Sequence, residues 1–489
     1  MDELVTFGRK VIYSDADSIT RDNVLAVLNR ALVTHWSNRG EISYLYQYKN
    51  GRQPILGRTK TVRPEINNKI VENRADEIVS FKTGYLLGDP IQYISRNGDS
   101  NNAKLTALND YMFAEGKAEK DKELADWFHT CGTAYRMILP TPVTIDDDCP
   151  FQLYILNPLN TFVVYQNDLG IPPLMGVYYV VKDNGDVVYN CYTRDTYFRV
   201  SGGSVVSEEP HLLGDVPIVE YPLNQARIGS FELVISMLDA INRIDSNRVD
   251  GVEQFVQALM KFHNMDIDSK DFETLREQGA IKYNDIDPQL PADVSYISNE
   301  LKQAETQVLV DYMYQTVLNI CGMPNRNGGS STSDTGSAVI MRDGWSSAEA
   351  RAKDTEAVFN RSEKRFLKIA LRICETLNGM KLNLTDIKIQ FTRRNYENIQ
   401  EKAQVLTTML GNSKIHPRLA FVHCGLFTDP EQAYSESAKY AEEQEKKALA
   451  QAQQISNKQE GGNDPKTQPG DGSPDRKDSQ TGQRGGSQD

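Results

Sequence analysis

Residues 230–262 read SFELVISMLDAINRIDSNRVDGVEQFVQALMKF, and this stretch decides the fold. Its apolar side chains recur every three or four residues, which predicts one helix about 50 Å long with a single apolar stripe. A second helix is predicted over residues 299–321, and the polar, turn-containing segment 263–298 would form the tip of a helical hairpin. The apolar stripe of the first helix comprises Phe231, Val234, Leu238, Ile241, Ile244, Val252, Phe255 and Leu259.

An antiparallel pair of helices leaves outward apolar faces that need further helices to cover them. Two explanations stay open from the periodicity. The hairpin is either an ordinary internal helical domain packed on the rest of the chain, or neighbouring copies of the same chain cover its apolar faces.

The segment before the hairpin, residues 151–221, changes to a period of two and is rich in β-branched and aromatic residues. Strands are predicted over 151–155, 161–165 and 177–181, with hairpin turns at 183–186 and 201–203. No helical pattern separates these strands, so we expect an antiparallel β-meander.

The remaining segments are mainly helical. Amphipathic helices are predicted over residues 23–48, 64–84 and 346–377, and residues 387–391 form a lone strand that must pair with an earlier one. Helices continue from 395 to about 455. Residues 456–489 contain no aliphatic or aromatic side chain apart from proline rings, so we expect a disordered tail. The fold class predicted is α+β.

Composition narrows the function. The 489 residues carry 54 Lys and Arg against 67 Asp and Glu, a net charge of −13, which argues against tight sequestration of nucleic acid. The six cysteines include no CxxC pair, which is typical of a reducing compartment. The chain contains no run of about 20 apolar residues, so we expect a soluble cytoplasmic protein without a membrane partner.

Motifs of catalysis are missing. The glycine-rich stretch 329–337 has no lysine after its second glycine, as a phosphate-binding loop requires. The six histidines show no zinc-ligand spacing, three adjacent aspartates at 146–148 are more typical of a solvated turn, and no GxSxG nucleophile motif occurs. We therefore expect no enzyme, no catalytic residue, no metal and no cofactor.

Several segments, in order and at characteristic spacing over residues 21–450, resemble the portal (head-tail connector) proteins of tailed double-stranded DNA bacteriophages, in the family found in long-tailed phages of Gram-positive hosts. They are NNKIV at 67–71, GYLLGDPI at 84–91, GTAY at 132–135, NPLNTFVVY at 157–165, GDVPIVEY at 214–221 and GSA at 336–338. What the resemblance implies is a portal-type fold that forms a ring oligomer.

The family's parts map onto this chain in sequence order. The resemblance implies a wing of N-terminal helices and β-meander (1–229), completed by a long helix and strand (346–394). The stem hairpin would comprise 230–262 and 299–323, around a small α/β clip at 263–298. A tunnel loop (324–345), a helical crown (395–455) and the disordered tail (456–489) complete the assignment.

The resemblance also implies the function. A ring of twelve copies, or thirteen when isolated, would sit at one capsid vertex as the channel for packaging and ejection of double-stranded DNA, which passes without sequence preference. The ring would nucleate procapsid assembly with the major capsid and scaffolding proteins. It would dock the terminase large subunit and head-completion or connector proteins. The protein would be assembled in the host cytoplasm and reside in the virion.

Two sets of residues are candidates for the channel surface. The uncharged tunnel-loop residues Asn327, Ser330, Ser331, Thr332 and Ser333 would touch DNA backbones weakly. Arg326 is either the strongest phosphate contact of that loop or a helix-end cap. In the first stem helix, acids outnumber bases by five to three, and the predicted channel-lining acids are Glu232, Asp239, Asp250 and Glu253.

Two other classes of function stay as alternatives. One is a capsid-associated interaction protein that forms no ring and recruits partners through its disordered tail. The other is a nucleotide-hydrolysing motor, which would turn over ATP as an isolated chain.

Overall fold

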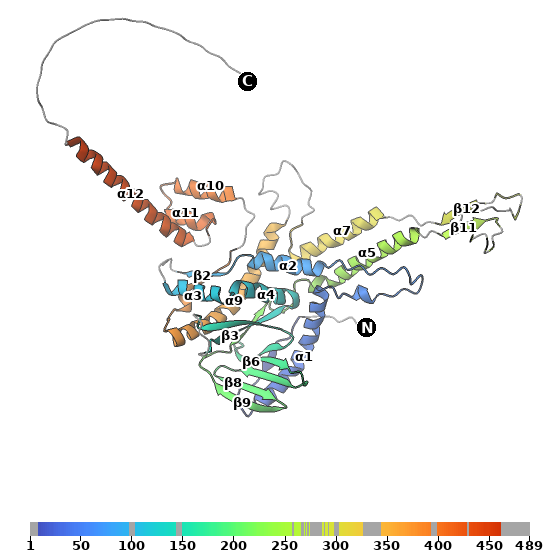
Figure 1. Cartoon of the computed structure of the whole chain (residues 1–489), viewed down its shortest axis with the longest axis horizontal. Helices are drawn as coiled ribbons and strands as arrows, with labels where there is room; N and C mark the ends of the chain where they lie inside the picture. The colour runs from blue at the N-terminus through green and yellow to red at the C-terminus, as the bar shows by residue number, and fades with distance from the viewer. Residues whose placement is uncertain are drawn as a thin grey trace, which may run out of the picture. The chain divides into compact units, whose positions relative to one another are not determined.

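The computed structural model describes residues 8–96, 103–142, 149–256, 259–265, 268, 270, 273, 286–287, 289–291, 293–297, 303–325, 344–392, 399–427 and 430–460. The chain divides into two compact units, Met1–Pro430 and Glu431–Asp489. Helices and sheets are both present, as the predicted α+β class requires (Figure 1).

The larger sheet has six strands in the order β1-β5-β6-β7-β8-β9. From β5 to β9 the neighbours are antiparallel and follow the chain, which confirms the meander, whereas β1 pairs with β5 in parallel. The buried stripe of α1 (Val24–Lys49) packs on this sheet. The strands are β1 (Ile12–Ser14), β5 (Thr161–Gln166), β6 (Pro173–Val181), β7 (Val187–Tyr192), β8 (Thr196–Ser201) and β9 (Ser204–Pro210).

A second sheet corrects the sequence analysis, because the predicted first strand of the meander belongs to it. That strand, β4 (Phe151–Leu156), pairs with β3 (Thr133–Pro140), and β3 pairs with β10 (Ile218–Pro222). Helices α3 (Ala103–Ala114) and α4 (Lys117–Cys131) share one apolar core with this sheet. The periodicity gave no signal for β3, since six consecutive residues from Thr133 to Ile138 are buried.

The predicted third long helix is confirmed as α9 (Trp345–Asn378), which ends at Gly379 with φ of 65°. Its apolar stripe, including Phe359, Phe366 and Ile373, joins the same core. The lone strand predicted over residues 387–391 pairs with an earlier strand, as expected: β13 (Ile387–Gln390) is antiparallel to β2 (Gln92–Ser95).

A buried ionic network ties α9 to α4 and β3. Glu363 accepts from Arg136 at 3.0 Å and from Lys117 at 2.9 Å, and Asp121 pairs with both bases. The Arg136 and Glu363 side chains are fully buried. Burial alone would raise the pKa of Glu363, but Lys117 and Arg136 outweigh it and lower the pKa to about 2.

The predicted helix over 64–84 begins ten residues late, as α2 (Arg74–Leu87). Residues 51–73, which we call the strap, contain only the short 3₁₀ helix η1 (Pro54–Gly57). Arg63 has a φ of 51°, and the chain from Asn68 to Glu72 hydrogen-bonds to another helix instead of forming its own turns.

The predicted hairpin is formed by α5 (Ile235–Val256) and α7 (Gln303–Cys321), which lie side by side (Figure 1). The first helix is shorter than predicted: its start is the 3₁₀ turn η2 (Glu232–Val234), and its expected last turn is strand β11 (Leu259–His263). Strand β11 pairs antiparallel with β12 (Asp293–Ile297). Most of the proposed clip between them lies outside the described residues.

Two short helices close the first unit, α10 (Ile399–Leu410) and α11 (Pro417–Cys424), which contact each other. In the second unit, α12 (Pro430–Glu460) is a single helix that extends past Ser456, where the sequence predicts the tail to begin. Residues 461–489 lie outside the described residues. None of the described helices combines the length and apolar character that crossing a bilayer requires.

Candidate functional site

The strap is held along α5 by a row of polar side chains. Asn242, Ser246 and Asp250 accept hydrogen bonds from the backbone N–H groups of Glu72, Ile70 and Asn68, at 2.8, 3.0 and 2.8 Å. Four helical residues rise about 6 Å, and two extended residues advance about 6.6 Å, so the two spacings nearly match. This match explains why the strap is extended here rather than helical.

Asp250 is the most heavily bonded member of this row. Its carboxylate accepts from Lys60 at 2.5 Å, from Arg58 at 3.1 Å and from both nitrogens of Asn68. Burial acts to raise its pKa, but the hydrogen bonds from Lys60 and Asn68 prevail and hold the pKa below its usual value. The side chain is 3% exposed, so the prediction that Asp250 lines a channel is wrong for this residue.

The prediction that Glu232 lines the channel is also wrong. Its carboxylate pairs with Arg9 at 2.5 Å and accepts from the backbone N–H of Gly229 at 2.8 Å, and its side chain is 1% exposed. Arg9 in turn donates to the backbone carbonyl of Cys131. Glu232 thus joins the N-terminal segment to the start of the hairpin and presents no charge to solvent.

The other two predicted acids differ from each other. Asp239 is half-buried and accepts from the Tyr48 hydroxyl at 2.8 Å, and burial raises its pKa. Glu253, near the end of α5, is exposed. Of the four candidates, Glu253 alone is exposed.

The strap adds positive charge to the folded stem. Residues 231–262 contain five acids and three bases, a net charge of −2, but the strap contributes five bases against two acids, a net charge of +3. The strap and helix together therefore carry +1. Residues 299–323 of the stem carry three acids against one base, so the strap reduces the net charge of the whole stem from −4 to −1.

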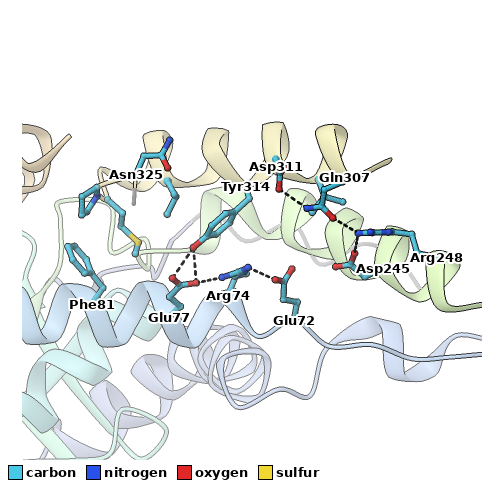
Figure 2. Close-up of a pocket in the computed structure, with 14 residues that line it drawn as sticks. Glu72, Arg74, Glu77, Phe81, Asp245, Arg248, Gln307, Asp311, Tyr314 and Asn325 are labelled. Carbon is cyan, nitrogen blue, oxygen red and sulfur yellow. Dashed lines mark hydrogen bonds and ion pairs between the residues drawn. The ribbon is translucent and has the colours of Figure 1, made fainter. Parts of the chain in front are cut away.

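On another side of α5 lies a groove of about 400 Å³ between α2, α5 and α7. Figure 2 shows α2 along the bottom and α7 along the top, with Arg74 between Glu72 and Glu77. Arg74 pairs with both acids, and its guanidinium lies 4.0 Å from the centre of the Tyr314 ring. The Tyr314 hydroxyl donates to Glu77 at 2.9 Å, and burial followed by this bond raises the pKa of Tyr314 to about 12.

The groove has an excess of negative charge. Arg248 pairs with Asp245 at 3.4 Å and donates to Gln307 at 2.8 Å, while Gln307 donates to Asp311 at 2.8 Å. The lining contains four acids, Glu72, Glu77, Asp245 and Asp311, against the two bases Arg74 and Arg248. Its net charge is −2, which repels phosphate and attracts cations.

One face of α7 exposes four large apolar side chains, with the exposed polar residues Glu305 and Asn319 among them. Val308, Leu309, Tyr312 and Ile320 are exposed by 68, 49, 66 and 44% respectively. Val308 and Tyr312 lie on the side of α7 opposite its buried residues Val310, Val317 and Cys321, and Leu309 and Ile320 lie on its flank, about 90° from them. The described residues do not cover this face.

The predicted tunnel-loop residues Arg326, Asn327, Ser330, Ser331, Thr332 and Ser333 all lie outside the described residues. The structure describes the chain up to Asn325, which lines the groove, and again from Gly344. Among the described residues, no group of His, Cys, Asp or Glu side chains is arranged to hold a metal ion.

The strap contacts and the groove were both missed by the sequence analysis. One signal was present: Asn242, Ser246 and Asp250 place polar residues at a spacing of four on one face of a helix that must be packed. Such a row predicts a polar partner for that face.

A family model described as phage portal protein, SPP1 Gp6-like, matches residues 30–450 of this chain. Among solved structures, the chain is similar to a chain in the neck of an empty GTA particle, computed with C6 symmetry. The identity is 12%, the match covers 72% of this chain and 90% of the other, and the TM-score is 0.42. No curated protein sequence matches.

Proposed function

The chain belongs to the SPP1 Gp6-like family of phage portal proteins, and from that premise we propose that it forms a closed, dodecameric ring at one vertex of the capsid. The ring is the channel through which double-stranded DNA is packaged and later ejected. Isolated rings contain twelve or thirteen copies, because a small change in the angle between subunits changes the number that closes the ring.

The observation that carries this proposal, beside the family, is the uncovered apolar face of α7. A face with Val308, Leu309, Tyr312 and Ile320 exposed is costly in water and is stabilised when a neighbour covers it. In a ring, the same chain supplies that neighbour at every position.

The parts of the ring follow the fold. The two sheets with α1, α4 and α9 form the wing, α5 and α7 with the strap form the stem, and α10 with α11 belongs to the crown. The segment around β11 and β12 is the clip, which docks the terminase large subunit and then the head-completion or connector proteins. The ring also nucleates the procapsid with the major capsid and scaffolding proteins.

The channel surface differs from the one expected from sequence. With Glu232 and Asp250 buried and Asp239 half-buried, Glu253 is the one exposed acid of the proposed set. Weak contact with DNA then depends chiefly on the tunnel loop around Asn327 and Ser330–Ser333, with Arg326 as its cation. The protein works as a conduit rather than as an enzyme, and the energy for translocation comes from the docked terminase.

The test is end-on electron microscopy of the purified full-length chain, combined with mass photometry at micromolar concentration. We expect rings of about a dozen subunits with a central hole wide enough for a double helix, about 20 Å. Monomers and dimers alone, or rings with a hole too narrow for DNA, would exclude the proposal. They would favour an interaction protein that forms no ring.

A further inference from the structure

The outer face of α5 is the second uncovered surface of the hairpin. We use this name for Ser236, Ala240, Arg243, Ile244, Asn247 and Gly251, which are exposed or partly exposed; at the edge of this face Asn247 accepts a hydrogen bond from Arg58 of the strap at 2.5 Å. Five of the six side chains are uncharged, and most are small, so another helix can approach the α5 backbone closely. Arg243 is the single charge on this face and is exposed.

We propose that the outer face of α5 of one copy seats in the groove between α2 and α7 of the next, with Arg243 entering the acidic groove beside Asp311. This inference rests on the proposed ring and names the two surfaces that meet in it. The occupant of the groove is therefore a second copy of this chain.

Charge complementarity supports this pairing. The groove has a net charge of −2, and the carboxylate of Asp311 accepts a hydrogen bond from the neutral amide of Gln307 at 2.8 Å. A DNA phosphate would be repelled by the same charge, which excludes the nucleic acid as the occupant. An arginine brings the missing positive charge and several donors at once.

Arg243 and the α5 residues that line the groove lie on different sides of α5, as a head-to-tail contact between copies requires. At 3.6 residues per turn, Arg243 lies about 200° from Asp245 and about 140° from Arg248 around α5. A copy can therefore present Arg243 to one neighbour while its groove receives the arginine of the other. Contacts between two different surfaces of identical chains generate a ring when the rotation closes.

The two surfaces also lie at the same level of the stem. Arg243 is two residues from Asp245 and five from Arg248, which is at most about 8 Å along the helix axis. A closed ring has no rise from one subunit to the next, so its contacting surfaces must share a level. This condition is met.

The groove also offers apolar contact. Phe81, Val310, Leu318 and Met323 line it next to the charged residues. Val308 and Tyr312 of α7 are exposed beside Asp311. The aliphatic part of Arg243 and the side chain of Ile244 would cover Val308 and Tyr312, which the chain alone leaves in water.

The test uses charge reversal in the full-length chain. We expect Arg243→Glu to raise the concentration at which half of the protein is in rings by about tenfold or more, measured by mass photometry. Adding Asp311→Arg to the same chain should restore assembly. The matched control is Arg194→Glu, an exposed arginine in the turn between β7 and β8, which should assemble like the unmodified chain.

A cysteine pair keeps the test decisive if a charge variant folds poorly. The six native cysteines are buried, so Arg243→Cys with Asp311→Cys adds the exposed thiols. Mild oxidation should give a ladder of covalent oligomers, and either single variant should give none. The interface is overturned if rings form without a ladder and Arg243→Glu has no effect or Asp311→Arg does not rescue it. The ring proposal stands in that case. Absence of rings from the unmodified chain overturns both.

Discussion

The carboxylate of Asp250 accepts both the backbone N–H and the side-chain amide of Asn68, at 2.8 and 3.0 Å. These two residues lie 182 positions apart in the sequence. The pair fixes the strap to α5, and Lys60 and Arg58 complete the arrangement around the same carboxylate. An acid that the sequence suggests for a channel surface is instead the centre of an internal anchor.

Asp250→Asn removes the charge of this anchor but keeps its size. Arg58 and Lys60 then share a largely buried site without their anion, and we expect the free energy of unfolding to fall by about 2–4 kcal/mol. Urea denaturation would measure the loss, and limited proteolysis should cut the strap sooner. Glu253→Gln, on the same helix and exposed, is the control and should change stability by less than about 0.5 kcal/mol. Equal effects of the two variants would contradict the anchor.

Glu363→Gln tests the buried ionic network of α9. Arg136 and Lys117 would lose their shared carboxylate, and we expect a loss of about 3–5 kcal/mol at pH 7. Because the pKa of Glu363 is about 2 in the folded protein and 4.5 in the unfolded chain, its contribution to stability is complete above pH 4.5 and is lost as the pH falls toward 2. The stability gap between the two proteins should narrow over that range. Glu375→Gln, exposed on the same helix, should show no such gap at any pH.

We predict that His35 gives the stability of the protein a second pH dependence, at higher pH. Burial lowers its pKa from 6.5 to about 4, and its imidazole lies 3.2 Å from the Tyr179 hydroxyl. The unfolded chain therefore binds the proton more readily. The contribution to stability is complete above pH 6.5 and falls by about 3 kcal/mol as the pH drops to 4. His35→Gln should flatten the measured stability between pH 6.5 and 4, and parallel curves for the two proteins would refute this assignment.

Shortening the tunnel loop tests its role in DNA movement. Removal of residues 327–333 should lower the amount of nuclease-protected DNA per particle, because the uncharged contacts to the duplex are lost. Ring formation, seen by electron microscopy, should be unchanged. Arg326→Ala should weaken DNA retention in the same direction, with a smaller effect at high salt. Packaging at the normal level in the shortened chain would remove the case for this loop.

The sequence alone determined the elements whose signals are local. The helical pattern predicted over residues 23–48 is α1, in which Val24 and Leu28 are buried, and the predicted Asn184-Gly185 turn joins β6 to β7 of the meander. Gly379 marked the end of α9 correctly, because a left-handed residue terminates a helix without help from the rest of the fold. The segments that resemble the portal family, and their order, were likewise recognised from the sequence alone.

Only the tertiary structure decided where charges and ambiguous segments lie. Pro64 and the apolar residues after it have a helical pattern, yet their backbone groups bond to α5, which is distant in sequence. Glu232 and Asp250 could not be assigned by periodicity, because their partners Arg9 and Lys60 are 223 and 190 residues away. A carboxylate's exposure depends on which cation reaches it, and that is a property of the packed chain rather than of local spacing.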